Sequence, residues 1–407
     1  MTEVLEGVLD EAGAQLDAAV DLRRRIHEKP ELGNVLPGTQ AMVLEALAGL
    51  PLTVTTGTSL SSVIAVLDGA EPGPTVLLRG DMDALPMHED TDLEFKSTVD
   101  DAMHACGHDT HVAMLAGAAK LLSARRGSLR GRVAFMFQPG EEGHDGAKHM
   151  LDEGLLATAA AGAEPVSMAF AIHQSPSLPN GMIATKGSSL MASADTFLIT
   201  VRGRGGHASM PHHTSDPIPV ACEMVGAFQS MVTRRVDVFD PAVVSVARIQ
   251  AGTTSNVIPE TAELYGTVRT VSEKARDAVL ADIERVARGI ASAHGATAEV
   301  HIMPGYPVTV NDPDAAQFAL GVAGDLLGEA NVAEMPTPVM GAEDWSYVLQ
   351  EVPGAMAFLG TRPSGVAPRD VAPNHSNRMV LDEDAMAAGI ATYAAVTLEW
   401  LARAPSG

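Results

Sequence analysis

Apolar residues form short runs along much of the chain, and longer stretches of mixed polarity separate them. The runs are rich in Val, Ile, Leu, Phe and Ala and show no clean alternation, which is typical of strands buried on both faces. We expect such strands at 62–67, 75–79, 132–138, 167–174 and 355–360, and helices at 10–28, 111–124 and 383–402. This pattern predicts an α/β fold, in which ligands gather outside the strand ends.

The middle of the chain has a different order of elements. Strands are expected at 196–201, 243–250, 260–270 and 299–303, and helices at 217–232 and 272–293. The order β-α-β-β-α-β is that of a ferredoxin-like unit. Because 407 residues exceed one ordinary core, we predict two domains. A catalytic domain formed by 1–186 and 304–407 is interrupted by an inserted domain at 187–303.

The composition of the chain limits which cellular compartment and which classes of binding partner are expected. The chain has 27 Lys and Arg against 51 Asp and Glu, a formal charge of -24, which argues against nucleic acid and anionic membranes. Two cysteines, Cys106 and Cys222, cannot make a disulfide framework. The start of the chain lacks the pattern of a signal peptide, and no run of about 18 apolar residues occurs. We therefore expect a cytoplasmic protein without a nucleic-acid or membrane partner.

A thiol and an imidazole two residues apart precede an expected helix, in the sequence MHACGHD. They are Cys106 and His108, and the positive end of the helix dipole favours the metal-binding thiolate. Further candidate ligands lie in three other turns: Glu142, His173 and His375. Thiolate, imidazole and carboxylate are zinc ligands, whereas a structural zinc site is typically richer in cysteine. Five ligands exceed the need of one open site and suit two metal ions.

Carboxylates beside these ligands suggest chemistry beyond metal binding. Glu141 and Glu142 are adjacent, so one can bind metal while the other takes a proton from the attacking water. Asp81 and Asp83 close an expected strand, and Asp83 could accept the second N–H of a ligand histidine. A turn-forming or helix-capping role for either aspartate remains an equal alternative.

Six ordered motifs span essentially the whole chain. They are RGDMDALP (79–86), MHACGHD (103–109), QPGEE (138–142), GGHAS (205–209), NVIP (256–259) and GAED (341–344). With these motifs the chain resembles the family of binuclear-metal amidohydrolases and exopeptidases that includes aminoacylases, carboxypeptidases and succinyl-diaminopimelate desuccinylase. It is most similar to the branch of hippurate hydrolases, bacterial N-acyl-amino-acid amidohydrolases and plant auxin-conjugate hydrolases.

The resemblance implies a discontinuous metallopeptidase-like catalytic domain with an inserted ferredoxin-like α+β domain for lid and dimerisation functions. It also implies two divalent metal ions per subunit, with zinc or manganese expected first and cobalt or nickel open. The general base it implies is Glu141. The metal ligands it implies are Cys106, His108, Glu142, His173 and His375. The atom that bridges the two metals stays open.

The inserted domain carries a second set of candidates. On the expected strand 260–270, Arg269 lies on the polar face and could fork onto a carboxylate. The resemblance implies that Asn256 and Arg269 hold the substrate. It also implies that His207 stabilises the reacting carbonyl, often from the partner subunit, so we expect a homodimer.

Together these features predict a metal-dependent amidohydrolase that cleaves N-acyl-L-amino acids to a carboxylate and a free amino acid. A dipeptidase or carboxypeptidase with the same chemistry is the alternative. A catalytically inactive metal- or ligand-binding protein is a third hypothesis, against which the intact Glu141 and ligand set argue. A zinc nucleobase deaminase is set aside, because the His-x-Glu and Pro-Cys-x-x-Cys signature is missing from the sequence.

Overall fold

The computed structural model describes residues 3–403, and these form two compact units, each with its own core. The larger unit comprises Met1–Ser188, Val310–Pro336 and Tyr347–Gly407. The smaller unit comprises Ser189–Thr309 and Thr337–Ser346. The predicted insertion ran from 187 to 303, and the smaller unit takes a further short segment from beyond it.

A mixed sheet of eight strands forms the centre of the larger unit, in the order β1-β2-β4-β3-β5-β16-β6-β15. The strands are β1 (Thr53–Thr56), β2 (Val63–Asp68), β3 (Glu71–Asp81), β4 (Arg130–Gln138), β5 (Val166–Ser175), β6 (Ile183–Thr185), β15 (Val332–Glu334) and β16 (Gly354–Gly360). Neighbouring strands from β4 through β3 and β5 to β16 run parallel, and so do β6 and β15. The pairs β1–β2, β2–β4 and β16–β6 are antiparallel. All five strands expected in this part of the chain are confirmed. The others have three or four residues, and β1 is fully exposed, so no apolar run marked them.

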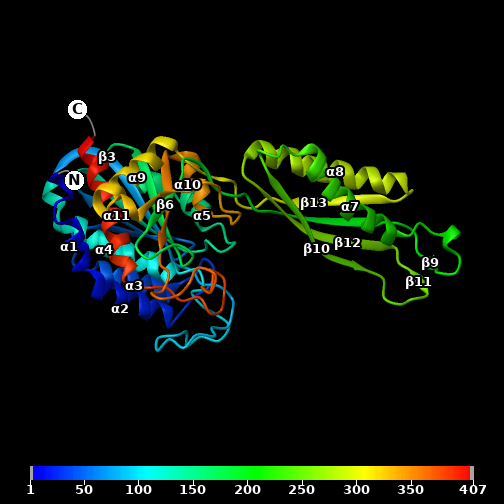
Figure 1. Ribbon diagram of the computed structural model, residues 1–407, viewed down its shortest axis with the longest axis horizontal. Helices are drawn as coiled ribbons and strands as arrows, with labels where there is room; N and C mark the ends of the chain where they lie inside the picture. The colour runs from blue at the N-terminus through cyan, green and yellow to red at the C-terminus, as the bar shows by residue number, and fades with distance from the viewer. Residues whose placement is uncertain (1–2, 404–407) are drawn as a thin grey trace. The chain divides into compact units, whose positions relative to one another are not determined.

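Helices surround this sheet (Figure 1). They are α1 (Val8–Gly13), α2 (Leu16–His27), α3 (Pro37–Leu47), α4 (His108–Ala124), α5 (Gly146–Asp152), α6 (Leu155–Ala159), α9 (Pro313–Leu327), α10 (Trp345–Glu351) and α11 (Ala385–Arg403). Helix α4 contacts α2, α11 and β3, and its residues are almost all buried. The single opening helix expected at 10–28 is wrong: α1 ends at Gly13, a poor helix former, and α2 begins at Leu16.

Helix α11 is long and apolar enough to cross a membrane by length and composition, the one such helix within residues 3–403. Most of its residues are buried in the core, including Ile390, Tyr393 and Val396. The Tyr393 hydroxyl also donates to the backbone oxygen of Arg79 at 2.6 Å. Its apolar character is therefore accounted for by core packing.

The smaller unit is a four-stranded antiparallel sheet in the order β10-β12-β8-β13, with α7 and α8 side by side on one face (Figure 1). Its main elements are β8 (Asp195–Arg202), α7 (Pro217–Arg235), β10 (Ala242–Ala251), β12 (Thr261–Thr270), α8 (Glu273–Ala293) and β13 (Thr297–Met303). Short strands complete the chain: β7 (Ser188–Met191), β9 (Gly206–His207), β11 (Val257–Ile258) and β14 (Thr309–Asn311). The predicted β-α-β-β-α-β order is confirmed. Alternate residues of β12 are buried, so Leu264 and Val268 share the core face and Arg269 lies on the other.

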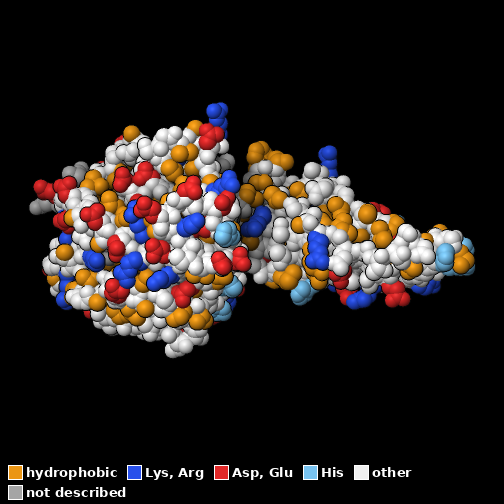
Figure 2. All heavy atoms as spheres, turned by 90° about the horizontal axis from the view of Figure 1, so that it is seen from below, with side chains coloured by type: hydrophobic (Ala, Val, Ile, Leu, Met, Phe, Trp, Pro, Cys, Tyr) orange, Lys and Arg blue, Asp and Glu red, His pale blue; other side chains and the backbone are white. Residues whose placement is uncertain are grey.

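Acidic and basic side chains are interspersed on the face of the larger unit shown in Figure 2. Surface ion pairs in this unit include Arg132 with Asp68 at 2.5 Å and Lys148 with Asp152 at 2.7 Å. Exposed pairs of this kind contribute little to stability, because water and salt screen them.

A buried charge network joins α2 to the first turn of α4. The ring of His27 contacts Asp109 through Nδ1 at 2.8 Å and Glu89 through Nε2 at 3.2 Å, and Arg23 Nε lies 3.1 Å from the same Asp109 carboxylate. Burial lowers the pKa of His27, but the two carboxylates outweigh it and raise this pKa to about 9. Both ring nitrogens therefore donate, and the imidazolium is the form that the fold stabilises.

This network predicts a loss of stability at alkaline pH. Because the pKa of His27 is raised from 6.5 to about 9 in the folded protein, its contribution is complete below pH 6.5 and disappears as the pH rises through 9. Denaturant unfolding measured from pH 6 to 10 gives the free energy of unfolding. Over this range it should fall by about 3 kcal/mol less in His27→Gln than in the unsubstituted protein. The exposed His301→Gln is the control and should follow the unsubstituted curve. Parallel curves for His27→Gln and the unsubstituted protein would contradict the assignment.

Candidate functional site

The first two candidate ligands stand at the turn that leads into α4. Gly107 between them has a φ of 80°, a left-handed conformation that favours glycine. A Cβ at this position would also lie 2.6 Å from the side chain of Gln174. The turn can therefore close only around glycine, and it places Cys106 and His108 at the carboxyl ends of the central strands.

The structure brings all five candidate ligands together within the larger unit. Donor atoms of Cys106, His108 and His173 lie within 4.8 Å of one another, and so do those of Cys106, Glu142 and His375. The Cys106 sulfur belongs to both groups and lies 3.4 Å from Nε2 of His173. The arrangement therefore offers two adjacent groups of three donors, with the thiol shared between them.

The hydrogen bonds of these histidines leave their inner nitrogens facing the cluster. The backbone oxygen of Asp83 accepts from Nδ1 of His108 at 2.9 Å, and that of Gln174 accepts from Nδ1 of His173 at 2.7 Å. Nε2 of His108 and Oε1 of Glu142 are buried and make no hydrogen bond in the described part of the chain. Their nearest charged neighbours are Asp81, 3.3 Å from the histidine, and His375, 3.2 Å from the glutamate. Buried polar atoms normally have partners, and fixing the outer ring nitrogen is typical of metal-binding histidine. This donor set fits divalent metal ions.

The charges of the cluster also favour a cation. Contacts with Cys106 and Glu142 raise the pKa of His375 to about 10, so without another cation a proton occupies this ring. Burial lowers the pKa of His173 well below its usual value, which keeps its imidazole neutral, the form that binds metal. Burial also raises the pKa of the Cys106 thiol. Metal binding would release protons from His375 and Cys106, as is general for such sites.

Asp83 holds the loop that carries the two glutamates. Its carboxylate accepts from the backbone amide of Glu141 at 3.0 Å and from that of Glu142 at 3.0 Å. From the sequence, this carboxylate was a candidate to orient a ligand histidine. The structure shows a different arrangement. The carboxylate lies 3.5 Å from Nδ1 of His108, and the backbone oxygen of Asp83 takes that hydrogen bond instead. Asp83 therefore serves both the histidine and the glutamates, by different atoms.

A buried pair beneath the ligands is Asp81 with His111. Nδ1 of His111 lies 2.5 Å from Asp81, which also pairs with Arg79 at 2.9 Å. Burial raises the pKa of Asp81, but Arg79 and the neighbouring histidines outweigh it and hold this pKa well below its usual range. His111 lies in the first turn of α4, beside the candidate ligand His108. Its spacing of three residues from His108 on one helix is the local signal that places it on the same face.

The candidate residues of the inserted segment lie in the smaller unit. Strand β9 pairs with β11 so that His207 lies opposite Val257, and the amide of Ala208 donates to the backbone oxygen of Asn256 at 3.1 Å. His207 is the second residue of this two-residue strand. The side chain of Arg269 is partly buried and makes no hydrogen bond or ion pair within residues 3–403. Burial lowers its pKa, and the charge of Asp195 opposes this shift only in part. Their catalytic and binding roles stay predictions.

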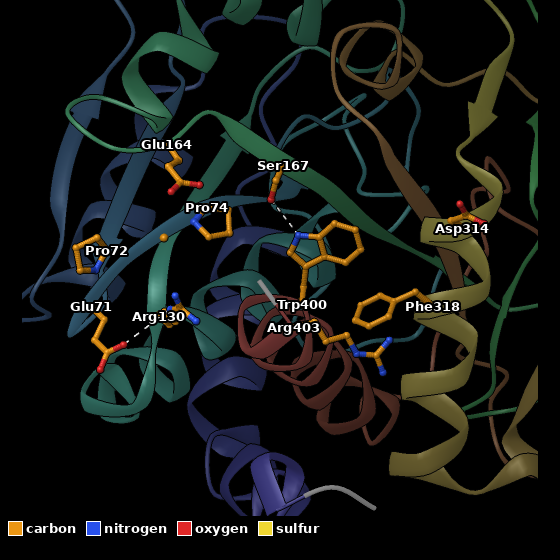
Figure 3. A pocket seen from close by; sticks show the side chains of 11 residues that line it. Glu71, Pro72, Pro74, Arg130, Glu164, Ser167, Asp314, Phe318, Trp400 and Arg403 are labelled. Atoms are coloured by element: carbon orange, nitrogen blue, oxygen red, sulfur yellow. Dashed lines mark hydrogen bonds and ion pairs between the residues drawn. The ribbon is translucent and has the colours of Figure 1, made fainter. Parts of the chain in front are cut away.

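A separate cavity of about 900 Å³ opens where β3, β4 and β5 begin (Figure 3). The Trp400 indole donates to Ser167 at 2.9 Å, and the Arg403 guanidinium stacks over Phe318 at 4.6 Å. Glu142 follows the carboxyl end of β4, and His173 lies near the carboxyl end of β5. The cavity and the metal centre therefore lie at opposite edges of one sheet.

Two groups of donors that share a thiol, with the buried carboxylate of Glu141 beside them, are the arrangement expected of a metallohydrolase. Residues 77–399 match the sequence model of the peptidase family M20/M25/M40, and the chain belongs to this family. It is a metal-dependent hydrolase of amide bonds, from a family that binds two metal ions. The predicted family resemblance is confirmed.

Individual relatives span nearly the same length. The chain is 40% identical over 388 residues to "Thermostable carboxypeptidase 1" of Saccharolobus solfataricus, covering 94% of this chain and 95% of that one. It is 41% identical over 343 residues to "N-acetylcysteine deacetylase" of Bacillus subtilis, covering 84% and 88%. A crystal structure from Bacillus subtilis, described as a dinuclear metal binding peptidase of the M20 family, superposes with a TM-score of 0.82 at 35% identity, covering 96% and 99%.

The shared thiol gives a direct test of the ligand set. Cys106→Ala should lose bound metal, because it removes the one donor that both groups contain. Metal content of protein purified without added metal, measured by plasma mass spectrometry, checks this. The matched control is Cys222→Ala, which removes the exposed cysteine and should leave the metal content unchanged. Normal metal content in Cys106→Ala would rule out Cys106 as a ligand.

Proposed function

We propose that the enzyme hydrolyses N-acyl-L-amino acids, such as N-acetyl or N-benzoyl derivatives, to a carboxylate and a free amino acid. The observation that carries this choice is Arg269, a partly buried guanidinium that makes no hydrogen bond or ion pair among the described residues. Asp195 acts on it only through a charge interaction that is weaker than the effect of burial. Its planar fork matches a carboxylate, and a substrate with a free α-carboxylate supplies one.

Two divalent ions, with zinc or manganese expected first, would polarise the scissile carbonyl and make water a better nucleophile. The residues that would hold them are Cys106, His108, Glu142, His173 and His375. Glu141 takes the proton from the attacking water and returns it to the leaving amine. Asp83 fixes the backbone of this base through its amide. His207 donates to the carbonyl oxygen as negative charge develops there. Asn256 and Arg269 hold the carboxylate end of the substrate.

The alternative substrate is a peptide, cleaved by a dipeptidase or carboxypeptidase with the same groups. One relative is named a carboxypeptidase and another an N-acetylcysteine deacetylase, at nearly equal identity. A panel of N-acetyl and N-benzoyl amino acids measured beside dipeptides separates the two. Higher kcat/KM on the acyl amino acids supports our proposal, and higher kcat/KM on dipeptides overturns it. Turnover of either class also excludes a catalytically inactive binding protein.

The role of Glu141 predicts a separation of catalysis from metal binding. Glu141→Ala should lower kcat by roughly 10²–10⁴-fold, the usual contribution of general acid–base catalysis. Metal content should stay normal, because Glu142 rather than Glu141 shares a donor group with Cys106 and His375. Steady-state kinetics and metal analysis on the same preparation check both parts. Unchanged kcat would remove Glu141 from the mechanism.

The carboxylate clamp predicts a preference between related substrates. The unsubstituted enzyme should cleave N-acyl amino acids far faster than their C-terminal amides or methyl esters. Arg269→Ala should cost about 2–5 kcal/mol in kcat/KM on the acids, as when one member of a desolvated charge pair is lost. Arg269→Lys should restore only part of the activity, since a point charge cannot reproduce the fork. Equal rates on acid and amide substrates in the unsubstituted enzyme would eliminate the clamp.

We further propose a cytoplasmic homodimer, in which His207 acts in the active site of the partner subunit. A reducing compartment suits a chain that uses Cys106 as a ligand. Strand β10 is an edge of its sheet and exposes Val243 and Ile249, so its unpaired backbone offers a surface for strand pairing between two copies.

Subunit mixing tests this arrangement. Homodimers of His207→Ala and of Glu141→Ala should both be nearly inactive. A heterodimer combines one subunit of each variant. If His207 acts in the partner's site, one of the two sites then lacks both His207 and Glu141, and the other site has both. Purified heterodimers carrying two different affinity tags should therefore regain about half of the activity of the unsubstituted dimer, because one of two sites is intact. Inactive heterodimers would show that His207 acts within its own subunit.

A further inference from the structure

One fully buried amide side chain contacts the segments of three candidate ligands. Gln174 follows His173 at the end of β5 and has no exposed surface. Its Nε2 donates to the backbone oxygen of Cys106 at 2.7 Å and to the side-chain oxygen of Asn374 at 2.7 Å. Asn374 directly precedes His375. These ligands come from a strand end, a turn before a helix and a separate loop, which no single element holds together.

The orientation of this amide is fixed by its partners. A backbone oxygen can only accept, so the NH₂ group of Gln174 must face Cys106. The side-chain oxygen of Gln174 then accepts from the hydroxyl of Thr361 at 2.8 Å. Both N–H groups and the oxygen are thereby used. The backbone amide of Gln174 also donates to Nε2 of His111 at 2.8 Å.

The loop of His375 needs such support. His375 has a φ of 67°, in the left-handed region that residues other than glycine rarely adopt. Its backbone amide donates to Ala105 at 2.9 Å, and its neighbour Asn374 is held by Gln174. Two contacts thus tie the strained residue to the segment that carries Cys106.

We propose that Gln174 is a positioning residue that sets the spacing of Cys106, His173 and His375 for metal binding. This inference rests on the metal assignment proposed above. Gln174 contacts none of the reacting atoms: it acts through the backbone of one ligand, the chain neighbour of another and its own covalent link to the third. Partners of this outer kind typically change metal affinity by about 10–100-fold when removed.

Two substitutions of similar size test the inference. Gln174→Met keeps the volume but removes all three polar contacts, and Gln174→Glu places a carboxylate against two acceptors. The measurement is the dissociation constant for zinc, obtained by competition with a chromogenic chelator on protein shown to be folded by circular dichroism. We expect a rise of about 10–100-fold for Gln174→Met and a larger one for Gln174→Glu. Thr361→Val is a milder change that frees the amide oxygen and should give a smaller rise, whereas Thr361→Ser should bind as the unsubstituted protein does.

A remote buried hydrogen bond provides the matched control. Thr185 on β6 donates to the backbone oxygen of Met356 at 2.5 Å, and Thr185→Val should lower the thermal stability without changing zinc affinity. The absorption spectrum of the cobalt-loaded protein gives a second readout, since its thiolate charge-transfer band should shift in Gln174→Met but not in Thr185→Val. Zinc affinity equal to that of the unsubstituted protein in both Gln174→Met and Thr361→Val would overturn the inference. Failure of the unsubstituted protein to bind two divalent ions would instead overturn the metal assignment.

Discussion

Buried carboxylates at the carboxyl edge of the larger sheet must be compensated, and the structure compensates most of them without a metal. Asp81 pairs with Arg79 and His111, and Asp109 pairs with Arg23 and His27. Asp83 accepts two backbone amides. An uncompensated charge in such a place would be very costly. The donors that these contacts leave uncompensated are therefore the ones to which a cation can bind.

Those remaining donors are the candidate ligands. His108 and Glu142 each keep a buried atom without a hydrogen bond among the described residues, and the Glu142 atom lies 3.2 Å from Nε2 of His375. Cys106 and Glu142 raise the pKa of His375 to about 10. The outer faces of His108 and His173 are already bonded to backbone oxygens. The surrounding hydrogen bonds and ion pairs thus distinguish the groups that support the site from the groups that are available to bind metal. Asp83 belongs to the supporting groups, because its carboxylate holds the backbone amides of Glu141 and Glu142 beside these donors.

The sequence predicted the parts of the fold that local patterns encode. Long apolar strands and the order of elements in the smaller unit were found, whereas β1 escaped because its residues are exposed and carry no apolar run. The five candidate ligands stood out because thiol, imidazole and carboxylate donors recur in four separate turns of the sequence. The roles of Asp83, His27 and Gln174 could not be read in the same way. Gln174 meets Cys106 from 68 positions away and His27 meets Asp109 from 82, so only the folded chain places them together.

The central claim is that two metal ions share the donor cluster of the larger unit. Crystals of the protein loaded with zinc, measured on both sides of the zinc absorption edge, test it most directly. We expect two anomalous peaks, with ligand atoms of Cys106, His108, Glu142, His173 and His375 at about 2.0–2.3 Å from one or both. A single peak, or peaks bound by other residues, would contradict the account.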